Sequence, residues 1–477
     1  MIDLENITIQ ELQKAMSHNQ ISARETVLWY LRRIAKIDQG KAGLNAVLEL
    51  NPDALFIADM LDEERKRGQV RSVLHGILVM LKDTINTADK MHTSAGSLAL
   101  AGNLAPYDAQ VVTRLRAAGA IVLGKTNMTE FANFMGEKMP AGYSSRGGQV
   151  LSPFNRDCTP SGSSTGSAVA VAANLCMAAL GTENFGSINY PAQQNGIVGV
   201  KPTMGLVSRY GNIPTTNTLD MIGPMTRTVE DAAILLGIIA GGDEQDPATL
   251  AQASDGYDYT QFLDKEGLRD ARIGIEREKW AGLTGTKLQA FERLLSTIRD
   301  AGAQIVEVQG ISEMISENDI DPVFFYECKS CMNAYLATLR PDLTCTSLQE
   351  IINYNQQHAD QTLKYGQPLL LLAQNKSSGR LVEPEYLEAL VKRERAIQKL
   401  DAMFEQHQVD VLLCTQCEIV APITGFPSMS FPIGMHKNRM PIGSYWIARR
   451  HDEATLLRIT YAVEMRLGVY CTPKGLT

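Results

Sequence analysis

Two kinds of apolar pattern alternate along this chain. The pattern over residues 7–36 and 52–67 predicts helices. Short runs of consecutive apolar residues predict buried strands, and these runs lie at 76–81, 120–123, 271–276, 303–308 and 409–414. Strand and helix signals alternate as far as Leu236. This alternation predicts an α/β fold in which helices cover the faces of a sheet.

Two further segments complete this picture. The alanine-rich stretch 168–180 predicts a helix, with a short strand expected at 177–181. Residues 323–407 predict several helices in succession. Because strand signals resume after residue 270, we expect the C-terminal part of the chain to return to the same sheet.

A lysine stands directly after the first apolar run. Lys82 follows residues 76–81, so a buried strand would carry its amine into a dry interior. Burial lowers the pKa of a lysine amine, and a neutral amine can accept the proton of a serine hydroxyl. The alternative is that Lys82 reaches water from the end of the strand, or pairs with the adjacent Asp83.

Two serines lie in glycine-rich segments further along the chain. Residues 161–167 precede the predicted alanine-rich helix, so the backbone N–H groups of this loop should converge at a helix N-terminus. Ser187 follows Gly186, whose backbone freedom can aim several N–H groups at one point. Ser163 and Ser187 are therefore candidates for a nucleophile and its proton relay. Serine and glycine are also ordinary loop and cap residues, which is the alternative.

Several longer motifs carry a resemblance to a known family. They are GILVMLKDTI at 76–85, SAGSLAL at 94–100, DAQVVTRLRAAGAIVLGKTNMTEFANF at 108–134, SGSSTGSAVAVAANL at 161–175, GTENFGS at 181–187, NGIVGVKPTMGLVSRYGNIP at 195–214 and GPMTRTVEDAA at 223–233. Weaker similarity continues to Glu464. Together these motifs resemble the amidase signature family of serine hydrolases, and within it the peptide amidase-like branch.

The resemblance implies a fold and a domain organisation. It implies a single amidase signature domain over residues 1–477, built on a large twisted mixed β-sheet flanked by α-helices. The signature core would cover about residues 70–240. The helical segment at about 323–407 would cover the substrate side.

The resemblance also implies roles for the three candidate residues. Ser187 would be the nucleophile, Ser163 a bridging serine that follows a cis peptide bond from Gly162, and Lys82 the group that directs the proton traffic. The activity implied is hydrolysis of a carboxamide, such as a C-terminal peptide amide or a small amide, through an acyl-Ser187 intermediate. It needs no metal and no organic cofactor.

The same resemblance places an oxyanion hole in the segment that ends at Ser187. Its donors would be the backbone N–H groups of Asn184, Phe185, Gly186 and Ser187. Phe185 departs from the family, which commonly has a glycine or a small polar residue at this position. Its N–H is still available, but we expect its ring to narrow the acyl site.

Two other functions would use the same scaffold. An amine instead of water could capture acyl-Ser187, which would make the protein an amide-forming acyl transferase. The chain could also be a non-catalytic assembly component resembling the amidotransferase subunit that works with partners. The presence of Lys82, Ser163 and Ser187 argues against this second function.

Two short motifs suggest other enzyme classes. Residues 119–126, GAIVLGKT, have the spacing of a phosphate-binding loop, but residues 120–123 are apolar and favour a strand instead of a flexible turn. Residues 162–166 have the GxSxG spacing that would make Ser164 the nucleophile of an α/β-hydrolase. That motif must follow a strand, and residues 154–161 predict none.

Cysteine spacing raises the question of a metal site. Cys328 and Cys331 form one CxxC motif, and Cys414 and Cys417 form another. The first pair lies in a helix-like segment, where residues at this spacing share a face and need no metal. We therefore predict reduced thiols without zinc or a disulfide.

Charge and the N-terminal sequence limit the expected partners. The 477-residue chain has a formal net charge of −8, which gives no electrostatic reason to expect nucleic acid or an anionic membrane as a partner. The first residues contain no basic and apolar segments typical of a secretory signal. We expect a cytoplasmic enzyme that acts on a small-molecule or short-peptide amide, and the sequence leaves its oligomeric state open.

Overall fold

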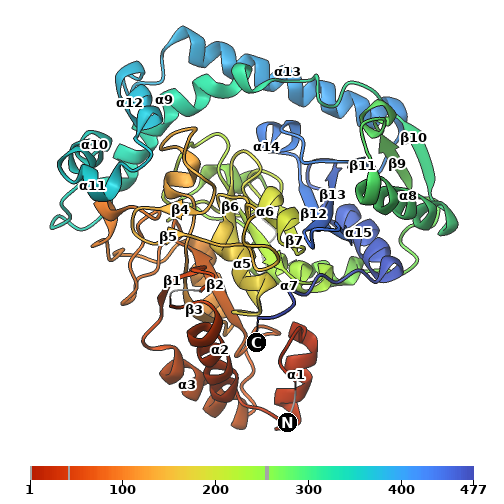
Figure 1. The fold of residues 1–477 in the computed structure, drawn as a ribbon, viewed down its shortest axis with the longest axis horizontal. Coiled ribbons are helices and arrows are strands. Elements are labelled where there is room, and N and C mark those ends of the chain that lie inside the picture. Colours follow the sequence, from red (N-terminus) through yellow and green to blue (C-terminus); the bar gives the residue numbers. More distant parts are fainter. Residues whose placement is uncertain (1–2, 41–42, 253–256, 477) are drawn as a thin grey trace.

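One large sheet forms the centre of the molecule (Figure 1). The computed structural model describes residues 3–40, 43–252 and 257–476, so residues 1–2, 41–42, 253–256 and 477 of the predicted domain lie outside the description. Within the described residues the sheet has 11 strands in the order β1-β3-β2-β6-β8-β7-β12-β13-β11-β9-β10. The strands are β1 (Val47–Leu50), β2 (Leu78–Lys82), β3 (Ile121–Thr126), β6 (Ala178–Glu183), β7 (Val198–Lys201), β8 (Met221–Thr226), β9 (Arg272–Ile275), β10 (Gln304–Glu307), β11 (Val411–Cys414), β12 (Ser428–Met435) and β13 (Pro441–Ala448). A separate hairpin consists of β4 (Tyr143–Ser144) and β5 (Gly148–Gln149).

The sheet is mixed. Strand β2 is parallel to β3 and β6, and β9 is parallel to β10 and β11. The other pairs are antiparallel, among them β6 with β8 and β12 with β13. The predicted large mixed sheet is confirmed, and each of the six predicted strand segments, including the one at 177–181, overlaps an observed strand. The C-terminal part of the chain returns to the same sheet, as predicted.

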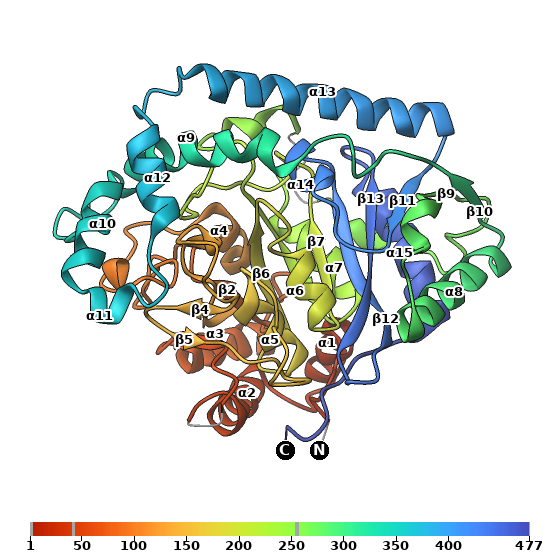
Figure 2. The same cartoon turned by 45° about the horizontal axis from the view of Figure 1, so that its top comes forward.

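Helices surround this sheet (Figure 2). They are α1 (Ile9–Ser17), α2 (Ala23–Ile37), α3 (Ala54–Lys66), α4 (Gln110–Ala117), α5 (Thr165–Ala172), α6 (Asn189–Gln194), α7 (Val229–Ile239), α8 (Gly285–Asp300), α9 (Glu317–Leu336), α10 (Leu348–Gln357), α11 (Ala359–Thr362), α12 (Pro368–Lys376), α13 (Pro384–His407), α14 (Val420–Thr424) and α15 (Glu453–Leu467). Short 3₁₀ helices lie at Leu98–Leu100, Glu130–Asn133, Pro247–Gln252, Tyr259–Phe262 and Arg277–Trp280. The predicted run of helices at 323–407 is confirmed as α9 to α13, which lie along the top and left of the molecule in Figure 2.

Two predicted helices have different bounds in the structure. The segment 7–36 is interrupted, because Ser22 caps a new helix by accepting a hydrogen bond from the N–H of Glu25. The helix predicted over 168–180 ends at Ala172, and Asn174 adopts a left-handed conformation with φ of 56°. The chain then enters β6, so the alanines of this segment are divided between a helix and a strand.

Helix α5 lies in the centre of the molecule because its residues are small. All eight residues of this helix, TGSAVAVA, are buried. At Gly166 a Cβ atom would lie 2.3 Å from the carbonyl oxygen of Asn127 and 2.5 Å from that of Ala46. The small residues thus let the N-terminus of α5, and the serine loop before it, approach the ends of the central strands.

Candidate active site

Lys82 is the last residue of β2 and is completely buried. Since β2 and β6 are parallel neighbours, their carboxyl ends meet at the same edge of the sheet. The amine of Lys82 donates a hydrogen bond to Ser163 Oγ at 2.7 Å and another to the carbonyl oxygen of Thr182 at 3.1 Å. The predicted buried strand end is confirmed, and two of the three candidate side chains are in direct contact.

The alternative that Lys82 reaches water or pairs with Asp83 is wrong. Its side chain does not reach water, and the carboxylate of Asp83 has other partners. That carboxylate accepts hydrogen bonds from the hydroxyl of Ser94 and the N–H of Gly96. It also lies 3.6 Å from the guanidinium of Arg146. The amine of Lys82 therefore donates its hydrogen bonds to Ser163 and to a backbone carbonyl, and not to Asp83.

Burial lowers the pKa of Lys82 to about 7. The ammonium form loses its hydration in the interior, and this desolvation outweighs the negative charges of Asp220 and Glu183, which raise the pKa. A large fraction of the amine is therefore neutral near pH 7. A neutral amine at 2.7 Å from Ser163 Oγ can accept a proton from that hydroxyl.

Ser163 lies in the loop before α5, and the peptide bond between Gly162 and Ser163 is cis, as the resemblance implied. Ser163 is buried, and its hydroxyl faces the amine of Lys82. The neighbouring residue ties this loop to the second candidate serine, because the N–H of Ser164 donates to the carbonyl oxygen of Ser187 at 3.2 Å. The loop at Ser163 and the turn at Ser187 therefore lie side by side.

The side chain of Ser164 has a structural role. Its hydroxyl donates to the carbonyl oxygen of Thr182 at 3.0 Å and accepts from the N–H of the same residue at 3.1 Å. No strand precedes it at 154–161 in the described chain, whereas a nucleophile elbow requires one. The α/β-hydrolase interpretation of this motif is therefore wrong.

A tight turn connects β6 to α6 and carries the predicted oxyanion donors. Among the described residues, the backbone N–H groups from Asn184 to Ser187 donate to no other protein group. The next two N–H groups, of Ile188 and Asn189, donate to the buried carboxylate of Glu183 at 2.8 and 3.0 Å. The carboxylate therefore fixes the start of α6, while the turn before it keeps its donors free for a ligand.

Ser187 is 7% exposed at the end of this turn. In the described part of the chain no hydrogen bond joins its hydroxyl to that of Ser163. Two links are therefore visible: Lys82 to Ser163 through side chains, and the Ser163 loop to Ser187 through the backbone of Ser164.

Sequence reasoning did not assign a role to Asp220. Its carboxylate accepts a hydrogen bond from the side chain of Asn184 at 3.1 Å and from the N–H groups of Thr215 and Thr216 at 2.8 and 3.2 Å. Asp220 thus holds Asn184, the first residue of the turn that carries the predicted oxyanion donors. In the sequence, only its position between the motifs that end at Pro214 and begin at Gly223 indicates that Asp220 lies near the site.

The ring of Phe185 points to the helical layer. It lies edge-on against the ring of Phe324 on α9, with 6.1 Å between the ring centroids. Phe324 in turn stacks on Phe134 at 6.1 Å. An aromatic cluster of Phe134, Phe185 and Phe324 therefore adjoins the turn that carries Ser187.

Gly186 is required by its conformation and its surroundings. Its φ is 91°, and a Cβ atom would lie 2.2 Å from the ring of Tyr190. We expect Gly186→Ala to displace the turn and lower kcat by about 10²–10³, the usual effect of losing one oxyanion donor. Gly148→Ala is the matched control, because its φ of 72° is similar but its nearest neighbour, Asn45, is 3.5 Å away. Equal kcat values for the two variants would contradict this account of the turn.

The remaining sequence motifs have structural explanations. Lys125 of the phosphate-loop spacing lies within strand β3 and donates to Thr93 Oγ1 at 2.7 Å, so the nucleotide-binding interpretation is wrong.

Cys328 and Cys331 lie on helix α9, as predicted, and all eight cysteines are free. Among the described residues no group of three or more His, Cys, Asp or Glu side chains is placed to hold a metal ion. No helix in the same part of the chain combines the length and the apolar character needed to cross a bilayer.

Comparisons with known proteins identify the class of this fold and site. The family model named Amidase matches residues 25–422. A probable amidase from Arabidopsis thaliana is 35% identical over 99% of this chain and 92% of its own length. A glutamyl-tRNA(Gln) amidotransferase subunit from Acinetobacter baumannii is 32% identical over 97% of this chain and 96% of its own.

Solved structures agree with this class. Native peptide amidase from Stenotrophomonas maltophilia is 40% identical and superimposes with a TM-score of 0.91, covering 98% of both chains. An amidase family protein from Bacillus anthracis is 35% identical with a TM-score of 0.93, covering 98% of this chain and 92% of its own. The chain therefore belongs to the amidase signature family.

Proposed function

We propose that this protein hydrolyses a carboxamide through an acyl-Ser187 intermediate, with Ser163 and Lys82 as its proton relay. The observation that carries the proposal is the hydrogen bond of 2.7 Å between the buried amine of Lys82 and Ser163 Oγ. A desolvated lysine whose only hydrogen-bonded side chain within the described residues is a serine has no evident structural purpose. Activation of a serine nucleophile requires such a lysine.

The reaction begins with attack of Ser187 Oγ on the amide carbonyl carbon. The hydroxyl proton passes through Ser163 to the neutral amine of Lys82, and the carbonyl oxygen becomes an oxyanion. The free N–H groups from Asn184 to Ser187 stabilise that charge, and each donor can contribute about 3–4 kcal/mol. The proton then returns through Ser163 to the leaving nitrogen, so ammonia or an amine departs and the acyl ester remains.

Water completes the reaction by the reverse route. Lys82 and Ser163 accept a proton from water as it attacks the ester, and Ser187 recovers that proton as the acid leaves. The protein groups supply every proton transfer, and no step calls for a metal or an organic cofactor.

The substrate class that we propose is a C-terminal peptide amide or a related small amide. The overall similarity to peptide amidase, at 40% identity over almost the whole chain, supports this choice. The aromatic cluster beside Ser187 would receive an apolar group next to the scissile carbonyl.

Two alternatives use the same fold. The similarity to a glutamyl-tRNA(Gln) amidotransferase subunit supports a role in an assembly. Capture of the acyl group by an amine would give amide synthesis. The contact of Lys82 with Ser163 favours catalysis over a purely structural role.

Ammonia release from peptide amides by the isolated chain tests the proposal. We expect stoichiometric formation of ammonia and the free acid, without any partner protein. Added hydroxylamine should give a hydroxamate in place of part of the free acid, because water and hydroxylamine attack the same acyl ester. Absence of both ammonia and a released amine across a broad panel of peptide and aryl amides would contradict the proposal.

The pH dependence of the reaction follows from the pKa of Lys82. The neutral amine is the active form, so kcat/KM should fall about tenfold per pH unit below about pH 7. Glu418→Gln is the control, because the pKa of Glu418 is raised to about 7 by burial and by the charge of Glu276. The fall of kcat/KM below about pH 7 should persist in the Glu418→Gln variant. A pH profile of this variant without that fall would contradict the role of Lys82.

A further inference from the structure

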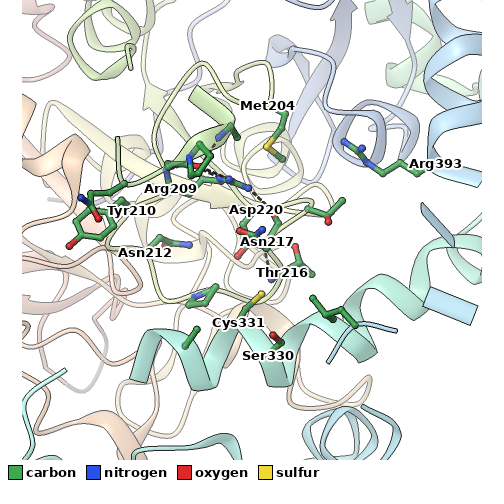
Figure 3. A pocket seen from close by; sticks show the side chains of 18 residues that line it. Met204, Arg209, Tyr210, Asn212, Thr216, Asn217, Asp220, Ser330, Cys331 and Arg393 are labelled. Atoms are coloured by element: carbon green, nitrogen blue, oxygen red, sulfur yellow. Dashed lines mark hydrogen bonds and ion pairs between the residues drawn. The ribbon is translucent and has the colours of Figure 1, made fainter. Parts of the chain in front are cut away.

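A cavity with polar and apolar lining residues lies close to the turn that carries Asn184. It has a volume of about 680 Å³ and lies between the segment 204–220, helix α9 and helix α13 (Figure 3). Thr216, Asp220, Ser330, Cys331 and Arg393 are among the residues that line it.

One side chain connects this cavity to the catalytic turn. Asp220 lines the cavity, and its carboxylate accepts the hydrogen bond from the side chain of Asn184. The backbone N–H of Asn184 is one of the four free donors of the turn. The contact between Asp220 and Asn184 thus connects the cavity directly to the turn that carries the predicted oxyanion donors.

Arg393 brings to the cavity a positive charge that forms no ion pair within the described residues. It reaches the cavity from helix α13, and its Nε donates to the carbonyl oxygen of Ile423 at 2.7 Å. In the described chain no carboxylate forms an ion pair with its guanidinium. Burial lowers the pKa of Arg393, because the loss of hydration outweighs the nearby charges of Glu394 and Glu327, which raise that pKa.

Two other charged side chains near the cavity already have partners. Arg209 forms an ion pair with Asp246, through its Nε at 2.8 Å and its Nη2 at 2.5 Å. Glu327, whose charge raises the pKa of Arg393, accepts the N–H groups of Asn217 and Thr218 and the hydroxyl of Tyr386. Of the two arginines that line the cavity, only Arg393 therefore lacks an ion pair within the described residues.

We propose that this cavity binds a carboxylate group and that Arg393 is the residue that holds it. A guanidinium offers parallel N–H donors that match the two oxygens of a carboxylate, and a desolvated site strengthens this contact. The carboxylate belongs either to the acyl part of the amide substrate or to a separate small carboxylic acid. The substrate form of the inference rests on the proposed function, whereas binding of a free acid does not.

Two matched peptide amides distinguish these sources. N-succinyl-Ala-Phe-NH₂ carries a carboxylate, and N-acetyl-Ala-Phe-NH₂ is its neutral counterpart. If the carboxylate belongs to the substrate, kcat/KM should be about 10–100 times higher for the succinyl peptide, the usual range for one charge-assisted contact. Arg393→Gln should reduce this ratio to about 1. Arg395→Gln is the control on the same helix, because Arg395 is exposed and does not line the cavity.

Binding to an inactive protein makes the test independent of turnover. Calorimetry with the Ser187→Ala protein should show Arg393-dependent binding of the succinyl peptide, or of succinate alone if the ligand is a separate acid. Arg393→Lys, which keeps the charge but loses the planar fork, should retain part of the affinity and shows that loss in Arg393→Gln is not unfolding.

The outcomes separate this inference from the proposed function. Hydrolysis of both peptides at equal rates, with neither the succinyl peptide nor succinate bound through Arg393, would overturn the inference and leave the amidase proposal standing. Arg393-dependent binding of succinate by a chain that hydrolyses no amide would overturn the proposed function and support the carboxylate site.

Discussion

Replacing Lys82 with methionine should abolish hydrolysis while making the folded protein more stable. Among the described residues the amine is the only base in contact with Ser163, so its loss should lower kcat/KM by about 10⁴ or more. Methionine fills a similar volume without a charge. The carbonyl oxygen of Thr182 would still accept the hydroxyl of Ser164, whereas the buried Ser163 Oγ would lose its hydrogen bond from the amine. That loss offsets about 1–3 kcal/mol of the gain in stability.

The gain in stability follows from the pKa of Lys82. A lysine with a pKa of about 7 in the folded chain and an ordinary value near 10.5 in the unfolded chain must lose a proton on folding at intermediate pH. Each pKa unit corresponds to about 1.4 kcal/mol, so the penalty grows as the pH falls from 10.5 to about 7 and is constant below. Lys82→Met should therefore raise the midpoint of thermal unfolding most clearly at pH 7 or lower. A variant that is inactive because it is unfolded would contradict this prediction.

Replacing Ser187 with alanine should remove activity by a factor of about 10⁴–10⁶ and leave the fold unchanged. The substitution deletes one hydroxyl that has no hydrogen bond to Ser163 in the described chain. Circular dichroism and the unfolding midpoint should match those of the original protein.

Ser164→Ala is the control for this prediction. It removes two hydrogen bonds to the backbone of Thr182, so we expect a loss of stability of about 1 kcal/mol per bond and an enzyme that still forms an acyl intermediate. An active Ser187→Ala protein together with an inactive, folded Ser164→Ala protein would favour the nucleophile elbow.

Local sequence patterns were sufficient to predict much of the fold and the centre of the site. The apolar run before Lys82 predicts a buried strand, and a lysine at its end can be inferred to be desolvated. The glycines around Ser163 and Ser187 predict tight turns with exposed N–H groups. The motifs of the family then suggest which of these residues act together.

Contacts between distant segments could not be predicted in this way. Asp220 reaches Asn184 only because β8 pairs with β6 in the folded sheet, and this pairing leaves no local signal at Asp220. The carbonyl oxygen of Thr182, which accepts the amine of Lys82, belongs to the backbone and is independent of residue type. Arg393 lies far along the chain on a helix whose sequence resembles any other charged surface helix.

The end of α5 shows a different limit. Alanine is common both in helices and in buried strands, so its density over 168–180 does not reveal where the helix stops. The left-handed residue Asn174 and the apolar strand β6 decide the boundary through tertiary contacts.

The most direct test of the central claim is the site of covalent labelling by a fluorophosphonate, mapped by mass spectrometry on the intact chain and its peptides. The account predicts one adduct per chain, on the hydroxyl of Ser187, and greatly reduced labelling of the Lys82→Met protein. An adduct on Ser163, Ser164 or any other residue, or unchanged labelling without Lys82, would contradict it.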